Sequence, residues 1–181
     1  DSPCTARVLM IRPARFGANP ETAASNAFQR EVRAEAGEVL TRARAEFDAL
    51  VSALRAHGVE VFVVEDTPAP PKPDAVFPNN WVSFHPGGTV VLYPMLAPGR
   101  RLERRMELLF ALEQRGGFAV SRLLDLSHHE LAGCFLEGTG SVVFDHAGKV
   151  AYACLSPRTN ADVLAELCEE LGYEPFAFDA T

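Results

Sequence analysis

The chain has 181 residues, of which 48% are hydrophobic and 23% are charged, and its net charge is -7. These values predict one globular domain, exclude a membrane-spanning segment and argue against nucleic acid as a partner. The four cysteines lack the spacing of a zinc site or a redox motif, so we expect no metal and a reducing, cytoplasmic setting.

The chain begins with a predicted strand, helix and strand. Apolar residues favour a strand over 6–12, and helical spacing favours a helix over 38–57 that ends at Gly58. A second strand is predicted over 59–64. The polar stretch 15–37 between the first strand and the helix is unusually long for a compact domain, which suggests a functional loop. Four prolines in 67–73 predict a stiff connection between this unit and residue 74 onward.

In the next part of the chain, the pattern of apolar runs and short turns that begins near residue 80 recurs about 60 residues later. Hairpins are predicted at 82–93 and 142–153, because β-branched runs flank short turns that contain glycine. Each hairpin leads into a predicted helix, over 99–115 with Leu102 and Phe110 inward, and over 160–171 with Asn160 or Thr159 as its cap and an end near Gly172. Closing strands are expected over 118–124 and 174–178. The repeating unit is therefore strand, strand, helix, strand.

Polar residues precede each hairpin at comparable places, and such places in a ring of repeats can converge. Glu137 lies before Gly138-Thr-Gly140, whose glycines let other groups approach closely. Its carboxylate could bind a cationic or urea-like group, or it could satisfy amides within a tight turn. Asn79 and Asn80 could bind a neutral planar group through donor and acceptor, or they could simply form the turn into the strand.

Three arginines are candidates for binding a carboxylate. Arg158 lies just before a helix, where a guanidinium could clamp such a group. Arg100 and Arg101 occupy the comparable place one repeat earlier, although a solvated positive surface explains them as well. The histidines have ordinary explanations. We expect adjacent His128 and His129 to point in different directions, which disfavours a metal site, and we expect the turn residues His85 and His146 to be solvated.

Four segments together resemble the pentein, or amidinotransferase-like, superfamily of guanidine-modifying enzymes. They are Met10-Ile-Arg-Pro13, Pro73-Asp-Ala-Val-Phe-Pro-Asn-Asn-Trp-Val-Ser-Phe-His85, Leu136-Glu-Gly-Thr-Gly140 and Leu155-Ser-Pro-Arg-Thr-Asn160. The second segment is most similar to a bacterial citrulline-hydrolysing branch. The resemblance implies an α/β propeller of five strand-strand-helix-strand repeats, of which about three are present here, as a partial domain over 1–181 with repeats near 6–66, 73–125 and 134–179.

The resemblance also implies roles for individual residues. Glu137 matches a Glu that holds a substrate nitrogen, and Asp74 matches an Asp that meets the α-amino group. Arg158, with Arg100 or Arg101, matches arginines near the α-carboxylate. The segment 19–28 matches a lid loop over the mouth of the site.

Two departures from the family pattern matter. Asn80 stands where deiminases usually carry an Asp, which suits a neutral ureido group better than a cationic guanidinium. The nucleophilic Cys and the proton-transferring His of the family are expected beyond Phe178, so this chain alone should lack the covalent chemistry. None of Cys4, Cys134, Cys154 or Cys168 lies in the matching context.

These observations predict that the complete protein is a hydrolase of citrulline or a related guanidino or ureido amino acid, working through a covalent Cys intermediate and without a cofactor. An arginine or dimethylarginine deiminase-type hydrolase is the first alternative. A non-catalytic pentein binding module is the second. Because part of a ring would expose apolar surface, we also expect self-association or association with the missing C-terminal part.

Overall fold

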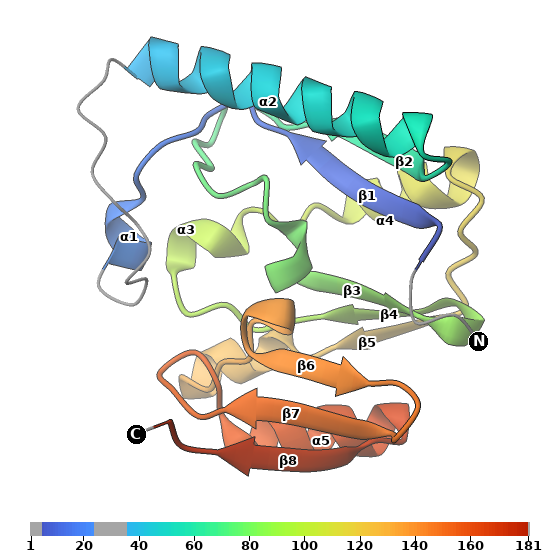
Figure 1. Ribbon diagram of the computed structural model, residues 1–181. Coiled ribbons are helices and arrows are strands. Elements are labelled where there is room, and N and C mark those ends of the chain that lie inside the picture. Colours follow the sequence, from blue (N-terminus) through green and yellow to red (C-terminus); the bar gives the residue numbers. More distant parts are fainter. Residues whose placement is uncertain (1–4, 24–35, 181) are drawn as a thin grey trace. The chain divides into compact units, whose positions relative to one another are not determined.

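A computed structural model describes residues 5–23 and 36–180 of the chain. It is a mixed α/β structure (Figure 1). The chain divides into two compact units. The first unit comprises the chain up to Pro78 together with Arg105–Gly117, and the second comprises Asn79–Arg104 with Phe118 onward. In the described ranges, every helix is too short or too polar to cross a lipid bilayer.

The first unit contains the expected strand, helix and strand. Strands β1 (Arg7–Arg12) and β2 (Glu60–Glu65) pair in parallel, from Arg7 opposite Glu60 to Arg12 opposite Glu65. Helix α2 (Ala36–Ala56) connects them and packs against β2 (Figure 1). The short helix α1 (Pro20–Ala23) lies in the long loop, and α4 (Met106–Arg115) also belongs to this unit.

The proline-rich connection after β2 is held by one lysine. The Lys72 ammonium donates to the Thr67 carbonyl at 3.1 Å, the Thr67 hydroxyl at 2.8 Å and the Pro70 carbonyl at 3.0 Å. It also forms an ion pair with Asp66 at 3.2 Å. Because one side chain ties both ends of the segment together, the connection is restrained by more than the stiffness of its prolines.

The second unit holds two three-stranded sheets of the same topology. In one, β3 (Val82–His85) and β4 (Thr89–Leu92) form an antiparallel hairpin and β5 (Arg122–Asp125) pairs with β4 in parallel. In the other, β6 (Val142–Asp145), β7 (Val150–Cys154) and β8 (Glu174–Phe178) repeat that order. Both predicted hairpins are confirmed.

Short 3-10 turns surround these sheets. They are η1 (Pro78–Asn80), η2 (Pro86–Gly88), η3 (Ser127–Ala132) and η4 (Gly138–Gly140). Turn η1 leads into β3 and η4 leads into β6, so the two hairpins are entered in the same way.

Helix α5 (Ala161–Leu171) covers one face of the β6–β7–β8 sheet (Figure 1). Asn160 caps it, because its side-chain oxygen accepts from the amides of Asp162 at 2.9 Å and Val163 at 3.1 Å. Its inward face joins a fully buried cluster made of Val91, Tyr93, Leu126, Leu136, Val142, Ala151, Ala153, Val163, Leu164, Leu167 and Cys168. Burial of this apolar surface is the main stabilising term for the unit.

The prediction of a single helix over 99–115 is wrong. It is split into α3 (Pro98–Arg101) and α4, and Leu102 and Phe110, expected inward, are exposed. The residues between the two helices make long-range polar contacts: Arg104 forms a fork with Glu130 at 2.5 and 2.9 Å. No glycine or proline marks this break, so local propensity could not reveal it. The closing strand also begins later than expected, at Arg122 rather than at 118.

His85 is buried, which corrects the expectation of a solvated turn residue. Its Nε2 lies 2.7 Å from the Ser83 hydroxyl, which in turn lies 2.7 Å from the Tyr93 hydroxyl. Burial, with smaller contributions from the charges of His146 and Lys149, lowers the pKa of His85 to about 4. Burial likewise raises the pKa of Tyr93. The imidazole is therefore neutral at physiological pH.

Candidate functional site

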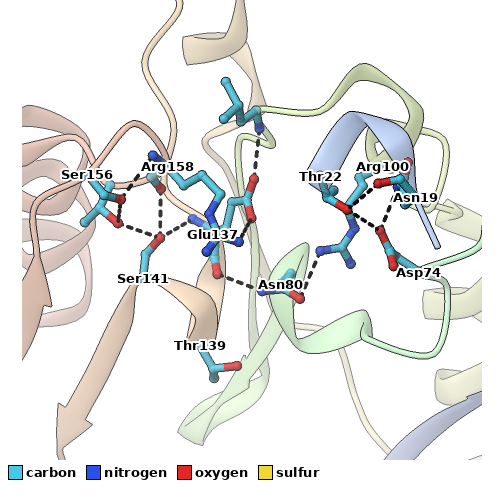
Figure 2. A network of polar contacts seen from close by, with 12 residues as sticks. Asn19, Thr22, Asp74, Asn80, Arg100, Glu137, Thr139, Ser141, Ser156 and Arg158 are labelled. Carbon is cyan, nitrogen blue, oxygen red and sulfur yellow. Dashed lines mark hydrogen bonds and ion pairs between the residues drawn. The ribbon is translucent and has the colours of Figure 1, made fainter. Parts of the chain in front are cut away.

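The two polar segments that precede the hairpins meet in the second unit. The Asn80 side-chain amide donates to the main-chain carbonyl of Glu137 at 3.3 Å (Figure 2). The Asn79 side-chain amide donates to the Thr139 hydroxyl at 2.6 Å. These residues lie about 60 positions apart in the sequence, in η1 and η4 and at the residues beside them. The convergence expected from the internal repeat is therefore present.

Two glycines make this approach possible. Gly138 has a φ of 43°, and a Cβ there would lie 2.2 Å from the Asn79 carbonyl oxygen. A Cβ at Gly140 would lie 2.5 Å from the Asn80 amide nitrogen. A side chain at Gly138 would push the segments apart, whereas one at Gly140 would displace the Asn80 side-chain amide.

The Glu137 carboxylate is 2% exposed and has two protein partners. Oε1 accepts from the main-chain amide of Leu96 at 3.1 Å, and Oε2 accepts from Arg158 Nη1 at 3.3 Å. Leu96 lies 41 residues away in the sequence, so the carboxylate does not serve amides of its own turn. A carboxylate has about four acceptor positions. These two contacts leave it able to accept from the paired N–H groups of a guanidinium or an amide.

Arg158 is held next to Glu137 by hydroxyl groups. The Ser141 hydroxyl donates to the Arg158 carbonyl at 2.8 Å and accepts from the Glu137 amide at 2.9 Å and the Thr159 hydroxyl at 2.9 Å. Ser141 thus uses its one donor and both acceptor positions within the site (Figure 2). Sequence reasoning missed Ser141 and assigned Thr159 only a capping role, although both lie at or beside segments that carry the family resemblance.

Arg100 is held in an internal ion pair. Its Nε and Nη2 donate to the two oxygens of Glu103 at 3.1 and 2.9 Å, which is the bidentate geometry that arginine favours with a carboxylate. Its Nη1 donates to the Asn80 side-chain oxygen at 3.1 Å. Asn80 therefore bridges Arg100 and the main chain of Glu137. Glu103 was not singled out from the sequence, and its spacing three residues after Arg100 was the available signal.

Arg101 contacts main-chain carbonyls. It donates to the carbonyls of Met95 at 2.9 Å and Leu96 at 3.2 Å, and its guanidinium lies 5.8 Å from the centre of the Phe135 ring. These contacts fix the loop whose Leu96 amide reaches Glu137. Arg101 thus holds the Leu96 amide in position against Glu137.

Asp74 lies in the first unit and is described there. It accepts from the Asn19 side-chain amide at 2.7 Å and from the Thr22 hydroxyl at 3.5 Å. Both partners lie in or beside α1, at the start of the segment 19–28 that was expected to form a lid. Residues 24–28 of that segment lie outside the described residues.

The charges of two ion pairs at the site, Glu137 with Arg158 and Glu103 with Arg100, balance. Glu137 and Glu103 contribute two negative charges, and Arg158 and Arg100 contribute two positive ones. Electrostatic attraction for a cationic ligand is therefore weaker here than at an isolated carboxylate pair. Among the described cysteines, Cys168 lies in the core, where burial raises the pKa of its thiol to about 11 and makes it a poor nucleophile.

Solved structures with the same fold support the assignment to α/β. The N-terminal domain of ArgZ, an arginine dihydrolase from cyanobacteria, superposes with a TM-score of 0.67 and 21% identity over 97% of this chain and 58% of its own. DDAH from Pseudomonas aeruginosa, complexed with citrulline, gives 0.64 and 15% identity, with 97% of this chain and 61% of that chain covered. AgrE bound to ornithine and NAD+ gives 0.65 and 23%, with 98% and 24% covered.

The chain thus spans about three fifths of the length of the first two structures. No curated protein sequence matches it. A family model described as "N,N dimethylarginine dimethylhydrolase, eukaryotic" matches residues 12–181, which is nearly the whole chain. The chain therefore belongs to this dimethylarginine dimethylhydrolase family, within the pentein superfamily to which the sequence motifs point.

Proposed function

We propose that the complete protein is a hydrolase acting on the guanidino or ureido carbon of an amino acid. The observation that carries this is the buried Glu137 carboxylate, fixed by Leu96 and Arg158 with acceptor positions to spare. Two parallel N–H groups on one planar carbon fit such a carboxylate. The family match and the fold shared with an arginine dihydrolase support the same substrate class.

Within this class we propose citrulline as the preferred substrate. The charge balance of the cluster lowers the advantage of a cationic guanidinium over a neutral ureido group. Asn80 adds no charge, and its side-chain amide donates to the main-chain carbonyl of Glu137. Dimethylarginine is the second candidate, because the matching family model is named for it.

We propose distinct roles for the remaining polar residues. Arg158 is the arginine best placed to meet a substrate α-carboxylate, since its side chain is 30% exposed while it contacts Glu137. Asp74 is proposed to bind the α-amino group, with Asn19 orienting it. Arg100 and Arg101 position Asn80 and the Leu96 amide, and Asn79 helps to hold the η4 turn through Thr139.

The covalent step is proposed to use groups outside this chain. The contacts found for the Glu137 and Asn80 side chains come from main-chain amides and carbonyls and from arginines, and Cys168 is committed to the core. We therefore place the nucleophilic Cys and its His in residues beyond Phe178. The β1–α2–β2 unit and the two sheets would then be three of five repeats.

One surface supports this arrangement. On the face of the β6–β7–β8 sheet opposite α5, Val143, Tyr152, Phe176 and Phe178 are 67%, 40%, 55% and 43% exposed. Three of them lie in register across neighbouring strands. We propose that further repeats, or failing them a second copy, cover this face.

The three described cysteines are free, which fits a reducing compartment such as the cytoplasm.

Product analysis tests the proposed function. The full-length protein is incubated separately with citrulline, arginine and asymmetric dimethylarginine. Hydrolysis of citrulline releases ornithine, ammonia and carbon dioxide, whereas dimethylarginine releases citrulline and dimethylamine. We expect ornithine from citrulline as the fastest reaction. Dimethylamine as the main product would assign the second candidate, and binding without turnover of any of the three would indicate a binding module instead.

A further inference from the structure

A cluster of metal-ligating side chains lies in the second unit, at residues to which the proposed function gives no role. His128 and His129 belong to the η3 turn, and Glu166 belongs to α5. One potential ligand atom from each lies within 4.8 Å of the others. The expectation that adjacent histidines point apart is wrong here, because their ring centres are 4.1 Å apart with an interplanar angle of 34°.

The hydrogen bonds of the two histidines show which nitrogen of each faces the possible metal position. His128 Nδ1 lies 3.0 Å from the Asp125 carbonyl, which can only accept, so Nδ1 carries the proton and Nε2 keeps its lone pair. A main-chain carbonyl on the second nitrogen is the usual way in which a protein orients a metal-binding histidine. His129 Nε2 lies 2.7 Å from Glu166 Oε2, an acceptor, so Nε2 donates here and a bound cation would replace its proton.

Both elements that carry these residues are anchored. The Asp125 carboxylate accepts from the Ser127 amide at 2.9 Å, and the His129 carbonyl accepts from the Cys134 amide at 3.1 Å. The third residue of the His-His-Glu run is not a ligand: Arg104 binds both oxygens of Glu130, at 2.5 and 2.9 Å. Helix α5 is fixed by its buried face. The carboxylate in this cluster is therefore Glu166, which the sequence places 37 residues from His129.

Two imidazole nitrogens and one carboxylate oxygen are a ligand set of Zn²⁺ sites that keep a position open for water. Zinc–ligand bonds of about 2.0 Å at tetrahedral angles place ligand atoms roughly 3.3 Å apart. His129 and Glu166 already lie closer than that, and His128 is exposed and able to move inward by the remaining distance. We propose that His128, His129 and Glu166 bind a divalent transition-metal ion, with Zn²⁺ as the best-suited metal, and that the ion links η3 to α5.

Zn²⁺ titration of the purified full-length protein tests this site. We expect one ion to bind, and His129→Gln, His128→Gln and Glu166→Gln each to weaken binding at least about tenfold. His57→Gln, an exposed histidine at the end of α2, is the matched control and should leave the affinity unchanged. Circular dichroism of each variant shows whether it remains folded.

Co²⁺ absorption separates this site from binding by cysteines. Nitrogen and oxygen ligands give ligand-field bands without thiolate charge transfer, whereas Cys134 or Cys154 as ligands would add it. Added Zn²⁺ should also raise the melting temperature of the wild type but not that of Glu166→Gln, because only the former gains binding energy in the folded state. Equal Zn²⁺ affinity in the wild type and the three variants, or thiolate bands in the cobalt spectrum, would overturn the proposal.

Discussion

The two sheets of the second unit have one topology and two different chemistries. In each, a 3-10 turn leads into an antiparallel hairpin whose second strand pairs in parallel with the strand after the helical segment. The turn before β3 carries neutral Asn80, whereas the residue before the η4 turn is the buried acid Glu137. Corresponding turns, although not corresponding residues, thus deliver different polar groups to one place, and the chemistry can change at a turn while the sheet stays the same.

The two hairpins also differ in how deeply a histidine at the end of the first strand is buried. His85, at the end of β3, is buried in a hydrogen-bonded chain with Ser83 and Tyr93. His146, just after β6, is exposed and contacts the Tyr173 hydroxyl at 2.7 Å. A histidine at the end of the first strand of a hairpin is therefore not by itself a signal of exposure. The exposure of such a histidine depends on whether neighbouring side chains cover it.

The largest expected effect comes from separating the two polar segments. Gly138→Ala places a methyl group 2.2 Å from the Asn79 carbonyl oxygen at a positive φ. We expect it to lower the free energy of unfolding of the second unit by about 3 kcal/mol, as the sum of left-handed strain and steric overlap. Denaturant unfolding followed by the fluorescence of Trp81, the sole tryptophan, measures this.

Gly87→Ala is the matched control for that substitution. Gly87 also has a positive φ, of 76°, but a Cβ there meets nothing within 4 Å. Only the backbone cost of about 1 kcal/mol should remain. Equal losses for the two variants would show that the contact between the Asn79 and Gly138 segments is not tight.

The next effect concerns the two histidines. The pKa of His85 is lowered from 6.5 to about 4 in the folded protein, so between these values the unfolded chain binds more protons. Its contribution to stability is present above pH 6.5 and is lost as the pH falls toward 4, by about 2 kcal/mol. Unfolding free energies measured across this range should show the loss in the wild type and in His146→Gln. His85→Gln should flatten the pH dependence, and an unchanged slope there would contradict the assignment.

The last effect concerns substrate preference. Asn80→Asp removes the N–H donor to the Glu137 carbonyl and adds a negative charge beside Arg100 and Glu137. We expect kcat/KM for citrulline to fall about tenfold to a hundredfold, using about 1.4 kcal/mol per tenfold, while arginine binds better. Asn79→Asp brings the same charge one residue earlier, at an exposed side chain, and should change the preference little. An unchanged citrulline-to-arginine ratio in Asn80→Asp would remove the physical basis for citrulline.

Much of this arrangement could be predicted from the sequence because it depends on local patterns. The hairpins follow from β-branched runs around glycine turns, and the Asn160 cap and the Gly172 stop of α5 follow from local hydrogen bonding. The meeting of the Asn80 and Glu137 segments followed from the internal repeat. The partners that depend on tertiary distance could not be predicted in this way. Ser141, whose hydroxyl donates to the Arg158 carbonyl, carries an ordinary sequence signal, and only the fold shows what it contacts. Glu103 differs, because its spacing of three residues from Arg100 was a local signal.

The break between α3 and α4 shows most clearly what local sequence patterns cannot predict. The residues 102–105 have good helix propensity, yet Arg104 is drawn to Glu130 and Arg105 donates to the Glu65 carbonyl at 3.1 Å. Long-range polar contacts of this kind override propensity, which is worth only a few tenths of a kcal/mol per residue. The proximity of His129 and Glu166 is another such case, since it joins a turn to a helix 37 residues away.

The central claim is that the Glu137 carboxylate binds the ureido or guanidino group. Isothermal titration of citrulline into the full-length protein and its Glu137→Gln variant tests it most directly, with Glu169→Gln, an exposed acid on α5, as the matched control. Loss of charge-assisted hydrogen bonds worth about 1.5–3 kcal/mol should weaken binding by Glu137→Gln at least tenfold and leave the control unchanged. Citrulline affinity that is the same in Glu137→Gln and the wild type would contradict the account.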